Sequence, residues 1–339
     1  MTLPTLISIH DVTINIGAMP ILVRTDSPEF AQMLEDRYGK FVTADAAAAV
    51  MELEIELIPP GRVCDAEDVS VRREAGRWVM ERGDFRAEWD PQCRRGWVRQ
   101  SASPYAIDGV LRILHSLILA RQGGLLAHAA SAVRNGRAFL FCGVSGAGKT
   151  TISRLAPPDV VLLTDEISYV RGFRIQDSGF GGPKSEVRSP HSQARTPDSG
   201  IQITDSESRP PSSEPETQCP ARSPQPPAPD PSSLAPDTWH LTPAFEAFGT
   251  PFAGELARVG ENLRAPLAAL YLLAQGPENR IEPMSEAEAA RELLQNILFF
   301  ARDEELVGMI FQTVCDFVRR VPVRRLVFTP DARVWELIG

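Results

Sequence analysis

Eight consecutive residues near the middle of the chain, 143–150, match the pattern G-x-x-x-x-G-K-[ST] in full. The glycines of such a loop allow backbone conformations that aim successive N–H groups inward, where they can surround phosphate oxygens. Lys149 would neutralise the β- and γ-phosphates of a nucleotide, and Thr150 would ligate Mg²⁺. The pattern therefore predicts a site for ATP and Mg²⁺ at Gly143, Val144, Ser145, Gly146, Ala147, Gly148, Lys149, Thr150 and Thr151.

Two consecutive acids, Asp165 and Glu166, follow a short apolar run at residues 160–163. In open α/β sheets the carboxyl ends of the strands border the ligand crevice, so both carboxylates are expected to face the phosphates. One would hold Mg²⁺, and the other would take a proton from an acceptor hydroxyl. The plainer alternative is an acidic pair at an ordinary strand end.

Three further residues are candidates for the same site. His128 lies in a run of small apolar residues before the loop, where it is either a site group or a satisfied core histidine. Glu255 could be another carboxylate on the metal side, and Arg280 could be a charge clamp on the transferring phosphoryl group. Both could equally be solvated loop charges.

The elements that would position these residues can be identified from apolar spacing. Residues 105–121 show helical spacing and end at Gly123-Gly124. Two short strands follow at residues 125–133 and 138–142, joined by a hairpin turn at Asn135-Gly136. The second strand leads directly into the loop, and a short helix at residues 150–155 precedes the strand at 160–163. This strand, loop, helix, strand order is a βαβ order.

The flanking regions differ in character. Residues 1–100 alternate in short runs, which predicts a small β-rich domain of unknown role with one helix near Phe30. Residues 101–339 would form the nucleotide-binding domain, interrupted at 177–237 by a segment that holds 13 of the 29 prolines and is rich in serine. Such a composition predicts a disordered insertion. Beyond it we expect a strand at 268–273, helices at 286–300 and 304–319, and a strand at 323–328.

Composition excludes several classes of function. A formal net charge of −9 argues against a nucleic-acid partner, because proteins that bind nucleic acids usually carry a basic face. No run approaches about 18 uninterrupted apolar residues, and the first residues lack a signal-peptide pattern, so we expect a cytoplasmic protein with no membrane partner. The five cysteines are scattered without metal-binding spacing.

His128, the complete loop and the pair Asp165-Glu166 together resemble the C-terminal domain of HPr kinase/phosphorylase, a fold related to ATP-dependent phosphoenolpyruvate carboxykinase. The resemblance spans residues 125–170 and extends more weakly over 249–328. There the segment Gly-Thr-Pro-Phe-Ala-Gly-Glu ending at Glu255 is similar to HPr kinase-like proteins of modified-peptide gene clusters. The resemblance implies an α/β domain with a mixed sheet, His128 in the site, Asp165 on the metal side and Glu166 at the acceptor hydroxyl. It also implies a possible homo-oligomer.

The chain departs from that family in two ways. Glu166 stands where the family's acidic pair usually has a second Asp, and no segment matches the one that grips HPr. The protein substrate of the family therefore cannot be assigned to this chain. We predict an ATP-dependent kinase that phosphorylates a hydroxyl, such as a serine of a peptide or small protein. The alternatives are a small-molecule kinase and a nucleotide-gated module that binds a peptide or carrier without forming a stable phosphoprotein.

Overall fold

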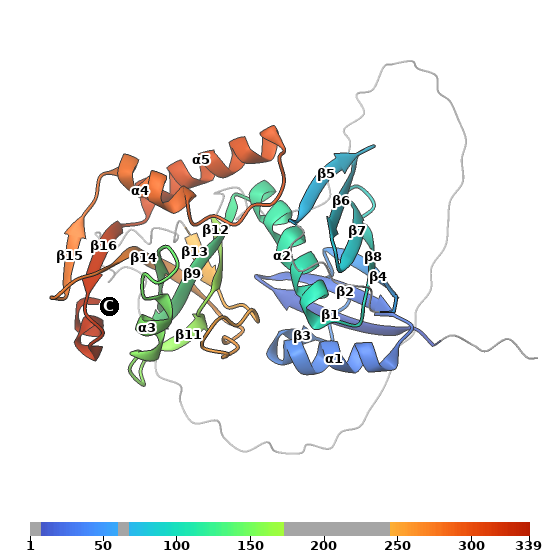
Figure 1. Cartoon of the computed structure of the whole chain (residues 1–339), viewed down its shortest axis with the longest axis horizontal. Coiled ribbons are helices and arrows are strands. Elements are labelled where there is room, and N and C mark those ends of the chain that lie inside the picture. The colour runs from blue at the N-terminus through green and yellow to red at the C-terminus, as the bar shows by residue number, and fades with distance from the viewer. Residues whose placement is uncertain (1–7, 60–67, 173–244) are drawn as a thin grey trace, which may run out of the picture. The chain divides into compact units, whose positions relative to one another are not determined.

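The computed structural model describes residues 8–59, 68–172 and 245–339, so the predicted insertion at 177–237 lies outside the described residues. The described chain is mixed α/β and contains an eight-stranded mixed sheet and a closed five-stranded barrel with extra strands (Figure 1). Within these residues, no helix is long and apolar enough to cross a bilayer.

The first sheet is built from the residues before Ser101 and has the strand order β3-β1-β2-β4-β8-β7-β6-β5. Side chains alternate along β4, where Met51, Leu53 and Ile55 are buried and the intervening glutamates point outward. The expected helix near Phe30 is confirmed as α1, which begins after Ser27, whose hydroxyl accepts the Phe30 N–H. The elements are β1 (His10–Ile16), β2 (Met19–Thr25), α1 (Pro28–Tyr38), β3 (Val42–Thr43), β4 (Met51–Leu57), β5 (Ser70–Glu74), β6 (Arg77–Arg82), β7 (Phe85–Asp90) and β8 (Arg95–Gln100).

The second sheet follows the helix α2 (Pro104–Arg121) and closes on itself. Its strands are β9 (Gly124–Arg134), β10 (Arg137–Cys142), β11 (Val161–Thr164), β12 (Ile167–Gly172), β13 (Phe245–Phe248), β14 (Arg264–Gln275), β15 (Arg280–Pro283) and β16 (Val323–Phe328). The ring runs β10-β9-β12-β13-β14 and closes because β14 also pairs in parallel with β10. Strand β11 pairs with β9 beside β12, and β16 and β15 extend the sheet from β14.

The predicted hairpin between β9 and β10 is confirmed. Asn135 and Gly136 both have positive φ, 52° and 72°, the conformation that a tight two-residue hairpin turn requires. Because β10 lies between β9 and β14, the residues that follow Cys142 emerge at one end of the barrel with a strand on either side. This end of the barrel holds the predicted phosphate loop, residues 143–151.

The helices beyond the barrel agree with the sequence except at one end. Helix α4 (Glu286–Leu294) stops six residues before the predicted end at residue 300, so that part of the prediction is wrong. Instead of continuing the helix, the next residues pair with β9. The His128 N–H donates to the Asn296 carbonyl at 2.7 Å, and the Leu298 N–H donates to the Leu126 carbonyl at 2.8 Å. Helix α5 (Glu304–Arg320) and strand β16 lie where the sequence placed them.

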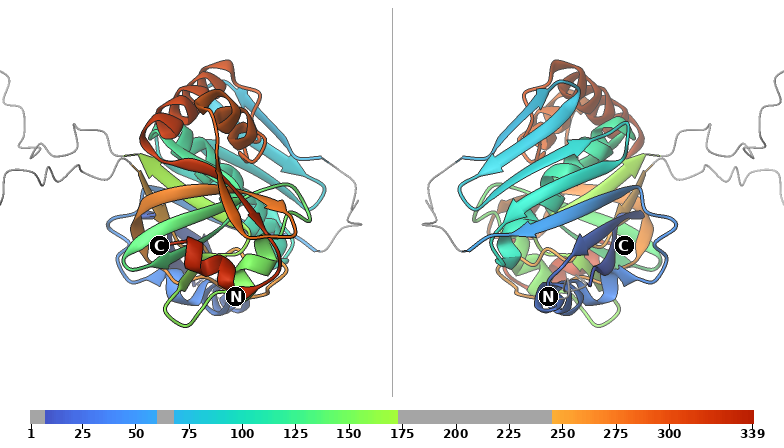
Figure 2. Two further views of the ribbon diagram at one scale, coloured as in Figure 1. Left: turned by 90° about the vertical axis from the view of Figure 1, so that its left-hand side faces the viewer. Right: turned by 90° about the vertical axis from the view of Figure 1, so that its right-hand side faces the viewer.

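Helix α2 joins the two sheets and is buried on nearly all sides. Of its 18 residues, 13 are buried, as expected for a helix that is apolar around most of its circumference. In Figures 1 and 2 it lies between the first sheet and the barrel. The described residues of both sheets belong to one packing unit with a shared core.

A buried histidine on α2 makes the stability of this core dependent on pH. The His115 ring is fully buried, its Nδ1 lies 3.0 Å from the Tyr169 hydroxyl, and burial lowers the pKa of His115 to about 4. The folded chain thus keeps His115 neutral, whereas the unfolded chain takes up a proton near pH 6.5. Stability from this group is therefore present above about pH 6.5 and is lost as the pH falls toward 4.

We predict that His115→Gln flattens the dependence of unfolding free energy on pH, because glutamine can hydrogen-bond but does not titrate. Between pH 7 and pH 5 the wild-type chain should lose about 2 kcal/mol through His115, and the variant should lose less by that amount. Urea unfolding at pH 7, 6 and 5 measures the difference. Parallel curves for the two proteins would contradict this account of His115.

Candidate functional site

The phosphate loop, residues 143–151, joins β10 to the short helix α3 (Lys149–Arg154) and depends on two glycines. Gly146 and Gly148 have φ of 81° and 108°, which residues with side chains rarely adopt. A Cβ at Gly148 would also lie 2.6 Å from Cζ of Phe328, the last residue of β16. The loop conformation therefore requires glycine here both for its backbone angles and for its packing.

Two distant side chains support the loop and its helix. Nε2 of Gln275, at the end of β14, donates to the Gly146 carbonyl at 2.8 Å. The buried indole of Trp335, in the terminal 3₁₀ turn (Ala332–Leu337), donates to the Ile152 carbonyl of α3 at 3.1 Å. Neither contact can be predicted from the sequence, because both residues lie more than a hundred positions beyond the loop.

Lys149 is buried and is directed back over the loop. Its Nζ donates to the Gly143 carbonyl at 2.7 Å and lies 3.4 Å from the Val144 carbonyl. An ammonium group has three donors, so one remains for a phosphate oxygen. Burial lowers the pKa of Lys149, while the charges of Glu166 and Glu255 act in the opposite direction. The loop thus carries a cation with a free donor and fits a polyphosphate group.

Three of the predicted metal-side residues meet beside the loop. The Thr150 hydroxyl donates to Oε2 of Glu255 at 3.2 Å. The buried Asp165 carboxylate accepts the N–H groups of Gly254 and Leu256, which flank Glu255, at 2.8 Å each. Asp165 therefore fixes the backbone that carries Glu255, and Glu255 contacts the loop.

This arrangement can be tested for its fit to Mg²⁺. Within the described residues, no three or more His, Cys, Asp or Glu side chains gather as a metal-binding cluster. Mg²⁺ in nucleotide sites usually keeps several waters and takes one or two protein oxygens together with substrate phosphates. The Thr150 hydroxyl and the Glu255 carboxylate are such oxygen donors, and they adjoin the phosphate loop. The residues present therefore fit Mg²⁺ bound together with a nucleotide.

Glu166 differs from its neighbour Asp165 in the contacts that its carboxylate makes. It lies in the two-residue break between β11 and β12, and its backbone N–H donates to the Thr164 hydroxyl at 3.2 Å. Its half-buried carboxylate accepts no hydrogen bond within the described part of the chain. Burial raises the pKa of Glu166, and the Arg112 guanidinium, 3.8 Å away, opposes that rise most strongly. A carboxylate without hydrogen-bond partners and with a raised pKa is suited to accept a proton.

The two remaining candidates lie in different surroundings. His128 is half-buried on β9 opposite Ile167, and its pKa is lowered by burial and then by the charge of Lys149. It is therefore close to the site and neutral. Arg280 begins β15 and pairs with Glu282 at 2.8 Å, and no described contact joins it to the loop.

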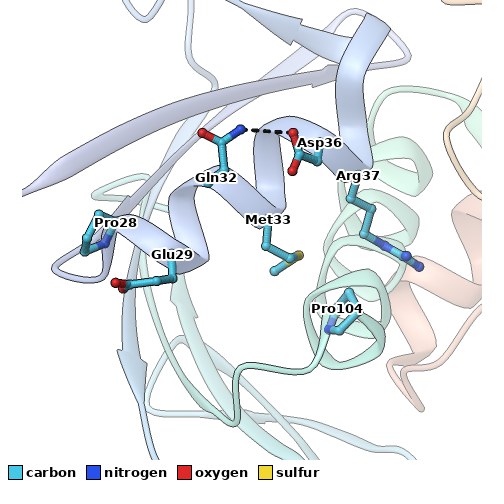
Figure 3. Close-up of a pocket in the computed structure, with 7 residues that line it drawn as sticks. All are labelled: Pro28, Glu29, Gln32, Met33, Asp36, Arg37 and Pro104. Atoms are coloured by element: carbon cyan, nitrogen blue, oxygen red, sulfur yellow. Dashed lines mark hydrogen bonds between the residues drawn. The ribbon is translucent and has the colours of Figure 1, made fainter.

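A hollow of about 800 Å³ lies elsewhere, between α1 and the start of α2 (Figure 3). No predicted site residue lines it. One of its residues, Arg37, is bound to the α2 carboxylate of Asp108, with Nε 3.1 Å from Oδ1. The lining residues are Pro28, Glu29, Gln32, Met33, Asp36, Arg37 and Pro104. This hollow is separate from the phosphate loop and offers no glycine-rich backbone to a phosphate.

Fold and site together define a mixed α/β protein with a closed barrel, at one end of which a glycine-rich phosphate loop lies beside two carboxylates. A comparison with known protein families finds no matching family model, and a search of curated proteins finds no match. Function is therefore inferred from the geometry of the site.

Proposed function

We propose that the chain is an ATP-dependent kinase that transfers the γ-phosphoryl group to a hydroxyl, with a serine of a peptide or small protein as the acceptor. The observation that carries this proposal is that the three acidic residues beside the loop make different contacts. Glu255 contacts Thr150 of the loop and Asp165 holds the Glu255 backbone, whereas the Glu166 carboxylate, which feels the charge of Lys149, accepts no hydrogen bond from the described residues. The resemblance to HPr kinase supports the same reading.

On this proposal each side chain has one task. The loop N–H groups and Lys149 bind the phosphates, and Thr150 and Glu255 hold Mg²⁺. Bound Mg²⁺ would neutralise charge on the phosphate oxygens. Asp165 holds the Glu255 backbone in place.

The acceptor side of the reaction falls to Glu166. As the acceptor oxygen bonds to the γ-phosphorus and the bond to the ADP oxygen breaks, Glu166 takes the hydroxyl proton. His128 pairs with Ile167, the residue after Glu166, and would contribute to this side of the site.

The test is incubation with ATP labelled in the γ-phosphate and the proteins encoded by neighbouring genes, followed by mapping of the labelled residue. Label on a serine hydroxyl, absent when Glu166→Gln replaces the wild-type chain, is the expected result. ATP binding or turnover without any labelled product would overturn the kinase assignment. It would favour the nucleotide-gated binding module instead.

A further inference from the structure

Arg112 lies on helix α2, next to the Glu166 carboxylate. Its guanidinium carbon is 4.7 Å from the centre of the Phe252 ring, and its Nη2 is 3.8 Å from Oε2 of Glu166. Phe252 belongs to the same segment as Glu255. The guanidinium is thus held by stacking on that segment and by the charge of Glu166, at a distance longer than a hydrogen bond.

The donors of Arg112 are not used within the described part of the chain. Its Nε is buried without a hydrogen-bond partner, and the contact with Glu166 is an ion pair only. Two other partly buried arginines use their donors. Arg37 is bonded to Asp108, and Arg134 donates to the Trp335 and Ile338 carbonyls. Buried donors in proteins are normally satisfied, so the buried and unpartnered Nε of Arg112, together with its unused Nη donors, points to an external acceptor.

The position of Arg112 indicates what that acceptor is. Glu166 is influenced electrostatically by Lys149 from the phosphate loop and by Arg112 from α2, so it lies near both cations. The planar fork of a guanidinium matches the oxygens of a phosphate or carboxylate. The side chain is 27% exposed, which leaves part of the fork open to a ligand.

We propose that Arg112 binds an oxyanion beside Glu166, either the transferring phosphoryl group or an acidic group of the acceptor. This inference rests on the proposed phosphoryl transfer, and it gives Arg112 the role of charge clamp that the sequence suggested for Arg280. Arg280 is exposed and its Nε donates to the Glu282 carboxylate at 2.8 Å, whereas Arg112 makes no hydrogen bond to its partner Glu166 within the described residues. The sequence gives no sign of Arg112, because it precedes the loop by more than 30 residues within a helix.

Inorganic phosphate is the probe for this oxyanion. Its binding to the full chain saturated with Mg²⁺ and ADP is measured by ³¹P NMR for the wild type, Arg112→Gln and Arg112→Lys. A charge-assisted contact of this kind contributes about tenfold to a hundredfold in affinity, so Arg112→Gln should weaken phosphate binding by that factor. Arg112→Lys keeps the positive charge but not the planar fork, so its phosphate affinity should lie between those of the wild type and Arg112→Gln. Arg121→Gln, on the same helix, is the matched control and should bind phosphate as the wild type does.

A second arm separates the two sources of the oxyanion. If the ligand is the phosphoryl group, a non-hydrolysable ATP analogue fills its place and phosphate no longer binds. If it is an acidic group of the acceptor, phosphate still binds in an Arg112-dependent way. Either result supports the proposal.

Equal phosphate affinity in wild type and Arg112→Gln, or no phosphate binding by the wild type, would overturn the assignment. Failure of the proposed kinase function can be told apart from failure of the Arg112 assignment. It would be seen in the experiment with labelled ATP, as absence of nucleotide binding or of a labelled product. The thermal transition of Arg112→Gln shows whether the variant is folded. If it is not, Arg112→Lys against the wild type decides.

Discussion

Lys149→Met should weaken ATP binding about a hundredfold while leaving the fold intact. The methionine side chain keeps the buried stem of Lys149 but removes the ammonium that donates to the Gly143 carbonyl and, on the proposed function, would contact the phosphates. A hydrogen bond from a charged donor contributes about 1.5 to 3 kcal/mol, and on the proposed function the same group would also neutralise the β- and γ-phosphates. Isothermal titration calorimetry with ATP and Mg²⁺ measures the loss directly.

Arg154→Gln is the matched control for this experiment. Arg154 ends the same short helix as Lys149 but is exposed, so its removal should leave the ATP affinity unchanged. If Lys149→Met binds ATP with wild-type affinity, the loop is a glycine-rich turn that happens to match the pattern, and the nucleotide site must be abandoned.

Local features of this fold could be predicted from the sequence, because they are decided by neighbouring residues. The Asn135-Gly136 turn, the apolar spacing of α2 and the strand that leads into the phosphate loop all depend on contacts within a few positions. The same holds for β16, which lies where it was expected.

Features decided by distant contacts could not be predicted. The barrel closes by pairing β10 with β14, whose residues lie more than a hundred positions further along the chain. Nothing in either strand alone specifies that partner. For the same reason the end of α4 was placed too late, since the residues after Leu294 pair with β9.

The candidate site divides in the same way. The sequence proposed Thr150, Asp165 and Glu255 for the metal side, and the structure brings them together. It could not show that both Asp165 oxygens are occupied by the N–H groups around Glu255, because that depends on the folded path of residues 249–263. Arg112 was missed because its place beside Glu166 is set by the packing of α2 and not by a motif.

Asp165→Asn and Glu166→Gln should fail at different steps although the residues are adjacent. An amide at position 165 offers one acceptor oxygen in place of two, so one of the partly buried N–H groups of Gly254 and Leu256 loses its partner. We expect a loss of about 1 to 3 kcal/mol in unfolding free energy and a higher Mg²⁺ requirement for ATP binding. Glu166→Gln should bind ATP normally and lose about 10² to 10⁴ in the rate of transfer.

Whether Asp165 acts on the metal directly or through Glu255 can be decided by a double-mutant cycle. If Asp165 only positions Glu255, then Asp165→Asn adds little to the Mg²⁺ requirement once Glu255→Gln is present, because the group it positions is already gone. Direct metal binding by Asp165 would make the two effects add. The measurement is the Mg²⁺ concentration for half-maximal ATP binding in the four proteins. Because Asp165 bonds the N–H groups on both sides of Glu255, we expect strongly non-additive effects on the Mg²⁺ requirement. Additive effects would instead indicate that Asp165 binds the metal directly.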